Sequence, residues 1–355
     1  MMRTFKEFFG PATIISLICL AIAAWDGYAR GGHTAAALFQ ALTIALLLGV
    51  LEISLSFDNA VVNATVLRTM SEVWQRRFLT WGILIAVFGI RFLFPIIIVA
   101  LASGMGFIEV VREAFGNPNL YTHHLENAQV SISAFGGTFL MMVFLKYFMD
   151  TEKDEHWVRG LESGLARFGQ FEGVQLLVTG ILLAALVNYT VAPAEQYTAL
   201  LAGLVGLLTY LAVDGLGSLF ETDDAASKVG AAGATAFIYL EVLDASFSLD
   251  GVIGAFALTK DVVLIAAGLT IGAIFVRSLT IMMVKKGTLE AYRFLEHGAH
   301  YGIGALAIIM LLSMNRNIHI PEVVTGLIGA GFIGLAVWSS LQANKRDERS
   351  ALNYR

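Results

Sequence analysis

Ten long apolar stretches constrain the fold of this chain more than any other feature. They are residues 11–26, 36–66, 79–102, 131–149, 173–190, 197–214, 230–258, 262–284, 298–314 and 322–342. Runs of this length can cross a bilayer, where each backbone polar group needs a partner within the protein. Because the apolar residues are continuous rather than alternating, a β-barrel is excluded. We therefore expect an all-α, polytopic membrane protein with about ten transmembrane helices.

The composition excludes an ordinary soluble domain. Hydrophobic residues make up 57% of the chain, charged residues only 14%, and the mean hydropathy is +0.72. The single cysteine, Cys19, excludes a disulfide framework and a thiolate metal site. No basic patch indicates nucleic-acid binding. The expected partner is the lipid bilayer, and we expect the first apolar run to be a retained span rather than a cleaved signal.

The basic residues predict the orientation. Of the 23 Lys and Arg residues, 16 fall in the terminal and even-numbered connecting segments, four fall in the opposite segments, and three lie within spans. The four are Arg30, Arg112, Lys260 and Arg316; the three are Arg91, Lys146 and Arg277. The positive-inside rule then places both termini in the cytoplasm, and we expect a bacterial inner-membrane protein.

We expect one membrane domain with five parts. They are an N-terminal span and loop (1–35), a first transmembrane repeat (36–150), a charged cytoplasmic loop with two connecting spans (151–229), a second repeat (230–315), and a last span with a polar tail (316–355).

Two acidic motifs lie deep inside apolar runs and share one spacing. Glu52, Ser54, Ser56 and Asp58 in LEISLSFDNA align with Asp244, Ser246, Ser248 and Asp250 in LDASFSLDGV. Carboxylates at membrane depth are costly and usually mark an ion or proton path. The paired motifs therefore indicate a buried polar site.

The similarity extends into the following spans, where Gly82 and Arg91 match Gly268 and Arg277. The motifs lie in the second and seventh spans, so the two copies run in opposite directions across the membrane. This is the inverted internal repeat typical of secondary transporters, whose sites form near the midplane at the interface of the repeats.

A continuous helix through either motif would carry polar groups on opposite sides. Glu52, Ser56 and Asn59 share one stripe, while Ser54 and Asp58 lie nearly opposite. Either protein surrounds these helices, or they unwind between the acids. Asn59 and Gly251, immediately after the aspartates, are residue types that tolerate such a break.

The donor set favours a hard divalent cation. The acids, serines and Asn59 are oxygen donors, which suit Mn²⁺, Ca²⁺ or Mg²⁺. Arg91 and Arg277 are expected to be structural or gating counter-charges, and these two positive charges leave the four acids of the motifs in excess. Clustered carboxylates also suit proton coupling, and a proton or Na⁺ counter-ion stays open.

Each of these residues also has a structural interpretation. Asp58 and Asp250, or Glu52 and Asp244, could simply pair with the arginines, and Glu241 fits either role. The serines could bond only their own helices. Four glycines of the last span, Gly326, Gly329, Gly331 and Gly334, predict close helix packing. The sequence leaves open the roles of His123, His124, His297, His300 and the 150–172 loop.

These motifs resemble the TerC family of bacterial membrane proteins, in its longer branch with domain of unknown function 475. The resemblance covers about residues 36–315, including Phe135-Gly136-Gly137-Thr138. It implies manganese export, with Glu52, Asp58, Asn59, Asp244 and Asp250 as ligands. Gly251 departs from the family pattern, in which a serine usually follows the second aspartate.

The leading hypothesis is a secondary transporter that exports divalent cations, with Mn²⁺ favoured and Ca²⁺ or Mg²⁺ open. The alternative is an accessory factor that delivers metal to exported or membrane proteins. We expect no resident cofactor and no enzyme, because no Ser-His or diacidic protease arrangement and no nucleotide-binding motif is present.

Overall fold

The computed structural model describes residues 2–153, 155–171, 173–219, 225–318 and 320–353. Within these ranges it does not describe the side chains of residues 2–6, 102, 216–219, 225–231, 249, 250, 253, 257, 322 and 348–353.

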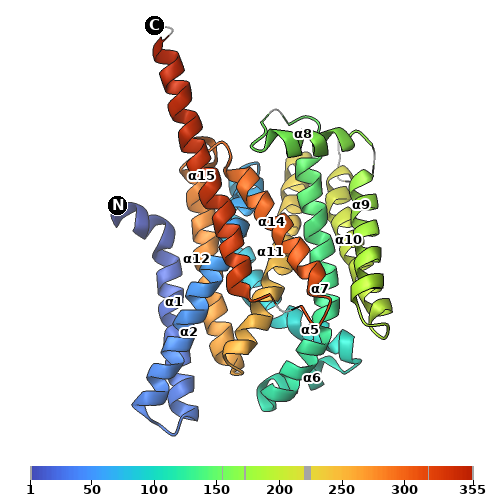
Figure 1. Ribbon diagram of the computed structural model, residues 1–355. Coiled ribbons are helices and arrows are strands. Elements are labelled where there is room, and N and C mark those ends of the chain that lie inside the picture. The colour runs from blue at the N-terminus through green and yellow to red at the C-terminus, as the bar shows by residue number, and fades with distance from the viewer. Residues whose placement is uncertain (1, 154, 172, 220–224, 319, 354–355) are drawn as a thin grey trace.

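Helices form every regular element of the described chain (Figure 1). In chain order they are α1 (Met2–Arg30), α2 (Ala35–Leu55), α3 (Phe57–Leu67), α4 (Glu72–Leu84), the π-helix η1 (Ile85–Leu93), α5 (Phe94–Ser103), α6 (Phe107–Gly116), α7 (Pro118–Phe148), α8 (Arg159–Phe168), α9 (Val174–Thr190), α10 (Gln196–Leu219), α11 (Ala225–Leu258), α12 (Val262–Lys285), α13 (Thr288–Ala291), α14 (Leu295–Leu312) and α15 (Glu322–Asn353).

The prediction of an all-α polytopic membrane protein is confirmed. Every predicted span coincides with a helix or a run of helices, and eight described segments are long and apolar enough to cross a membrane. The 17-residue α9 is a shorter apolar helix. Large hydrophobic side chains such as Trp25, Trp81 and Trp338 are exposed on the outside of the bundle, as expected for surfaces that face lipid.

Three of the eight described apolar segments are the most deeply buried in the bundle. They belong to α7, α12 and α14 and are 78%, 72% and 67% buried, against 22% for those of α1 and α15. Small residues bring them together: side chains at Gly136 and Gly137 of α7 would overlap Met310 and Leu311 of α14. The sequence motif around Gly136 therefore has a packing role.

The two acidic motifs lie on segments that run in opposite directions (Figure 1). In this view the chain runs upward through α2 and α3, which carry the first motif, and downward through α11, which carries the second. The segments that follow each motif are also opposed: α4, η1 and α5 run downward, whereas α12 runs upward. Both termini lie on the same side of the bundle as α8. This arrangement agrees with the antiparallel repeat that the sequence predicts.

Two connections contain more helix than expected. The predicted span at 131–149 is the second part of a 31-residue helix, α7, which begins at Pro118. Asn117 caps its first turn, and the added turns bury Tyr121 and Leu125, which explains why the helix extends beyond the most apolar residues. The charged 150–172 segment contains α8.

The first motif contains a break, but not at Asn59. α2 ends at Leu55 and α3 begins at Phe57, so the break lies at Ser56, between the two acids. Helical hydrogen bonds continue across it, since Ser56 N donates to Glu52 O (2.9 Å) and Ala60 N donates to Ser56 O (3.1 Å). The second motif has no break at Gly251, because α11 passes through this residue without interruption.

Candidate functional site

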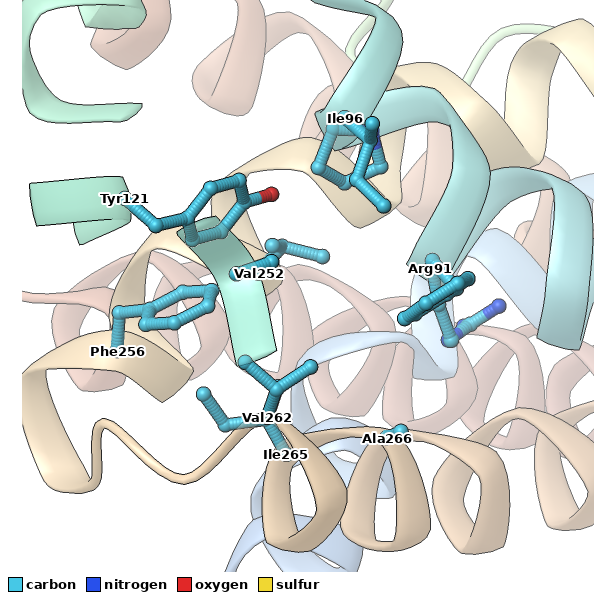
Figure 2. Close-up of a pocket in the computed structure, with 11 residues that line it drawn as sticks. Arg91, Ile96, Tyr121, Val252, Phe256, Val262, Ile265 and Ala266 are labelled. Carbon is cyan, nitrogen blue, oxygen red and sulfur yellow. The ribbon is translucent and has the colours of Figure 1, made fainter. Parts of the chain in front are cut away.

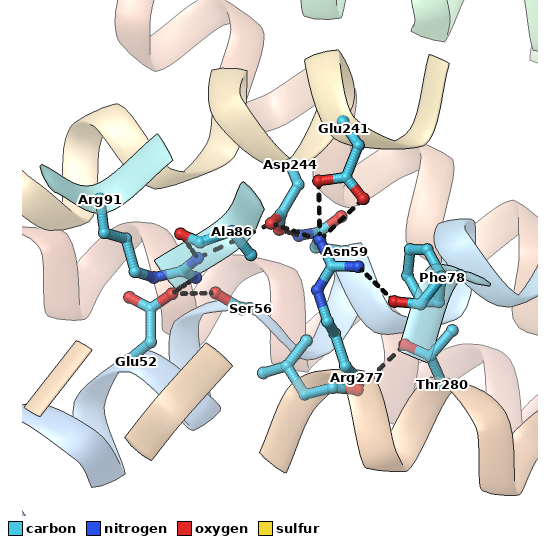
Figure 3. A network of polar contacts seen from close by, with 11 residues as sticks. Glu52, Ser56, Asn59, Phe78, Ala86, Arg91, Glu241, Asp244, Arg277 and Thr280 are labelled. Carbon is cyan, nitrogen blue, oxygen red and sulfur yellow. Dashed lines mark hydrogen bonds and ion pairs between the residues drawn. The ribbon is translucent and has the colours of Figure 1, made fainter. Parts of the chain in front are cut away.

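Glu52 on α2 forms an ion pair with a buried arginine, Arg91, on η1. Nη2 of Arg91 lies 2.6 Å from Oε1 of Glu52, and both side chains are only 3% exposed (Figure 3). The wider turn of η1 positions the arginine, whose Nη1 also donates to the carbonyl of Ala86 (3.2 Å). Ser56 Oγ donates to the same Glu52 oxygen at 3.2 Å.

The second repeat contains a corresponding ion pair. Nη2 of Arg277 on α12 lies 3.1 and 3.0 Å from the two carboxylate oxygens of Glu241 on α11, and its Nη1 donates to the carbonyl of Phe78 (3.2 Å). The guanidinium also covers the ring of Phe78, 4.2 Å from its centroid. Gly82 leaves the space for this pair, because a β-carbon there would overlap Nη1 of Arg277.

Asp244 joins the two ion pairs into one network (Figure 3). Its Oδ2 lies 3.3 Å from Nη2 of Arg277 and 3.7 Å from Nη1 of Arg91, and its Oδ1 accepts a hydrogen bond from Nδ2 of Asn59 (2.8 Å). Three carboxylates thus meet two guanidinium groups. The structural interpretation of Glu52, Asp244 and Glu241 as arginine partners agrees with the geometry, and the network also holds the two motifs together.

Asp58 lies outside this ion-pair network. Its Oδ1 accepts a hydrogen bond from the backbone N–H of Asn59 (2.9 Å), and no described basic side chain forms an ion pair with it. The alternative that Arg91 neutralises Asp58 therefore does not match the geometry. The carboxylate is 6% exposed, so an unpaired charge there would be costly without a bound cation or proton.

A small cavity connects Asp58 with Glu52. Its volume is about 30 Å³, and its lining consists of Glu52, Leu55, Ser56, Asp58, Phe247, Gly251, Leu306, Thr325 and Gly326. One buried water needs about 10–15 Å³, so the cavity can hold a cation with about one water. Gly251 lets Glu52 approach α11, since a β-carbon there would lie 3.0 Å from Oε2 of Glu52.

The predicted ligands thus separate into groups. Glu52 and Asp58 line the cavity, whereas Asn59 and Asp244 bind each other within the network. Among the residues that the structure describes, Oδ1 of Asn59 is buried and without a hydrogen-bond partner, as is Oδ1 of Asn63 one turn later. Asp250 belongs to α11, but its side chain lies outside the described part of the structure.

The serines do not act as a set. Ser54 is exposed and donates to Val50 O (2.8 Å), and buried Ser246 donates to Val242 O (3.0 Å), as the structural interpretation predicts. Ser248 is buried, and Ser56 alone of the four lines the cavity. Across the break at Ser56, Asp58 is buried, whereas Ser54 four residues earlier is exposed.

An apolar layer lies beside Arg91, toward the helix ends opposite α8. A cavity of about 20 Å³ separates this arginine from Tyr121 and Phe256, whose ring centroids are 5.4 Å apart (Figure 2). Val252 and Val262 also line it. Because this lining is apolar, the ion pairs beside it are poorly solvated, which strengthens them.

Four histidines contact neighbouring side chains or backbone groups. His297 Nε2 contacts Glu155 O (3.0 Å) and its Nδ1 contacts Tyr147 Oη (3.3 Å), while the His300 ring stacks on Tyr147 with centroids 3.5 Å apart. Buried Glu162 of α8 accepts hydrogen bonds from the N–H groups of Trp157 and Val158. His123 contacts Asn127, and His124 lies 3.6 Å from Glu113.

α14 and α15 also contribute to the cavity, which the acidic motifs alone did not indicate. Thr325 lines it, and β-carbons at Gly302 and Gly329 would lie 3.1 and 3.0 Å from Oδ2 of Asp58. The glycine spacing of the last span indicated close packing but not its partner. That prediction fits Gly326 and Gly329 but not Gly331 or Gly334, where a β-carbon would meet no atom within 4 Å.

The described side chains alone do not complete a strong metal site. Nowhere in the described ranges do three or more His, Cys, Asp or Glu side chains converge on one ion. The cavity instead offers two carboxylates with neutral oxygens from Ser56 and Thr325. Oxygen ligands of this kind suit a hard divalent cation.

Fold and buried network define the class: an all-α polytopic membrane protein with charged residues at the centre of its bundle. The chain belongs to the family described as "Protein of unknown function (DUF475)", whose model matches residues 57–347. The match includes Asp58, Asp244 and both arginines but begins after Glu52. No curated protein and no solved structure matches the chain.

Proposed function

We propose that this protein is a secondary transporter that exports divalent cations, with Mn²⁺ as the favoured ion. The observation that carries the proposal is the cavity shared by Glu52 and Asp58, in which Asp58 has no basic partner among the described side chains. A cation would supply the missing positive charge. The direction of transport and the choice of Mn²⁺ rest on the resemblance to the TerC family.

The ion-pair network supports movement of the two halves about this site. Asp244 contacts an arginine from each repeat, so the network can exchange partners when the halves rearrange. We place Glu52, Asp58, Asn59, Asp244 and Asp250 at the ion site, with Glu241, Arg91 and Arg277 as counter-charges. A proton or Na⁺ is the proposed counter-ion, in a bacterial inner membrane with both termini in the cytoplasm.

The decisive experiment measures Mn²⁺ flux by purified protein in liposomes that contain a Mn²⁺-quenched dye. Asp58→Asn removes the unpaired charge without changing the side-chain size, so we expect flux to fall to the protein-free rate. The matched control is Asp214→Asn, which removes a half-exposed carboxylate that pairs with Lys146 on the outside of the bundle. Wild-type flux by Asp58→Asn would contradict the proposal.

The same experiment separates the transporter from the alternative, an accessory factor that delivers metal to other proteins. A transporter moves Mn²⁺ with no partner in the liposome. An accessory factor would bind Mn²⁺ through the same acids but show no flux.

A further inference from the structure

We infer that α15 completes the ion cavity and that the Thr325 hydroxyl is a cation ligand that determines affinity and ion preference. This inference rests on the proposed function and names a residue outside both acidic motifs and both repeats. α15 packs against α14, α2 and α3, so it reaches the break between α2 and α3 where the first motif lies.

Thr325 presents an unused oxygen to the cavity. Its Oγ1 is buried and has no hydrogen-bond partner in the described structure. Threonines in membrane helices usually donate to the carbonyl four residues earlier. Thr43, Thr138 and Thr280 do so here, at 2.8, 2.8 and 3.0 Å. A buried hydroxyl left without such a bond costs free energy, which a ligand in the cavity would offset.

The glycines of α15 and α14 bring the helix backbones up to the same site. A β-carbon at Gly326 would overlap Leu55, and those at Gly302 and Gly329 would lie 3.1 and 3.0 Å from Oδ2 of Asp58. Thr325 and Gly329 are four residues apart and therefore share one face of α15. The Thr325 hydroxyl and the Asp58 carboxylate therefore line the same cavity. Close packing around Asp58 leaves little room for side chains at Gly302 and Gly329.

The size of the cavity and its oxygen ligands predict which cations the site would distinguish. Ser56 is held in place by its hydrogen bond to Glu52, whereas Thr325 is the cavity-lining hydroxyl without a hydrogen bond in the described structure. A volume of about 30 Å³ leaves room for about one water beside a cation, which must therefore give up most of its hydration. Mg²⁺ dehydrates reluctantly. A neutral protein oxygen that replaces water should thus favour Mn²⁺ over Mg²⁺.

The test measures Mn²⁺ binding by purified full-length protein in nanodiscs, from the loss of the electron paramagnetic resonance signal of free Mn²⁺, with Mg²⁺ as competitor. Thr325→Val keeps the shape and removes the hydroxyl. We expect its Kd for Mn²⁺ to rise about tenfold, a typical cost of losing a group at a metal site, and its preference over Mg²⁺ to shrink. Thr325→Ser should bind as wild type does. The control Thr43→Val removes an exposed hydroxyl on α2.

The outcomes separate this inference from the proposed function. Wild-type affinity and ion preference in Thr325→Val, with loss of binding in Asp58→Asn, would overturn the role of Thr325 and leave the transport site in place. Wild-type binding by Asp58→Asn would overturn the proposed function itself. If Thr325→Val is not monodisperse, Thr325→Ala replaces it, and wild-type binding by that variant would equally overturn the inference.

Discussion

At the scale of single residues, glycines determine where the buried charges can meet. Gly82 admits the pair of Arg277 and Glu241, and Gly272 admits the side chain of Glu52, since a β-carbon at either position would overlap these groups. Conformational freedom is not the reason for these glycines, because both lie within helices. They permit an ion pair between helices that pack too closely for any larger residue.

Gly82→Ala should therefore destabilise the protein. The added methyl group would force Arg277 away from Glu241 and leave buried charges unpaired, which typically costs about 3–5 kcal/mol. Thermal unfolding in detergent, followed by tryptophan fluorescence, would measure a lower Tm. The matched control is Gly89→Ala in η1, where the new methyl group would meet only Ile85 at 3.5 Å. Equal Tm values for the two variants would contradict this account.

Residue types alone identified the acids but not their partners. The sequence placed Glu52, Asp58, Asp244 and the two arginines in one buried region, because charges at this spacing in apolar runs need a common polar site. It could not show that both arginines share Asp244 and leave Asp58 unpaired. That division depends on the break at Ser56 and on the wide turn of η1. A shift of one residue in either segment would change which acids the arginines contact.

At the scale of elements, the loop between α7 and α8 folds over the ends of α7 and α14. Lys153 lies in this loop, 3.3 Å from the centroid of the Tyr147 ring. Its Nζ is buried and has no hydrogen-bond partner among the described residues. The cation–π contact favours the charged ammonium group. Burial outweighs it and lowers the pKa of Lys153 from 10.5 to about 8, although Glu162, Glu296 and Asp150 oppose the change.

This lowered pKa predicts that stability rises with pH. The unfolded chain binds more protons than the folded protein between about pH 8 and 10.5, so deprotonation favours folding across this window. Below pH 8 the buried lysine is charged in both states and its desolvation cost is fully present. The Tm of the wild type should therefore increase from pH 7 to pH 10 relative to that of Lys153→Met. Lys345→Met, at an exposed position of α15, serves as the control, and identical pH profiles for all three proteins would refute the prediction.

The elements themselves were largely predictable. Continuous apolar runs located the long helices, because a membrane helix needs this length and composition. The first turns of α7 were not predicted, since Pro118 to Asn127 is polar on one side and reads as a loop when only hydropathy is considered. The role of α15 in the cavity was also missed, because it arises from packing between helices far apart in the sequence.

At the scale of the whole molecule, both termini and the α7–α8 loop lie on one side of the helix bundle (Figure 1). The distribution of Lys and Arg predicts that this side is the cytoplasm. The α1–α2 connection, which contains exposed Thr34, lies on the opposite side, and exposed Thr151 lies in the α7–α8 loop.

Cysteine labelling in intact cells tests this orientation. In a Cys19→Ala background, Thr34→Cys should react with a membrane-impermeant maleimide added outside the cells, and Thr151→Cys should react only after lysis. Both sites are exposed, so a difference in labelling reports the side of the membrane rather than burial. Labelling of Thr151→Cys in intact cells, with Thr34→Cys protected, would reverse the orientation and the proposed direction of transport.

The proposed transport depends on a cation that lies between the first motif and α15. Anomalous diffraction at the manganese absorption edge, from crystals of the full chain grown with Mn²⁺, locates such an ion directly. We predict a peak in the cavity within coordination distance of Glu52, Asp58 and Thr325. A map in which Mn²⁺ occupies other positions while this cavity contains only water would contradict the account.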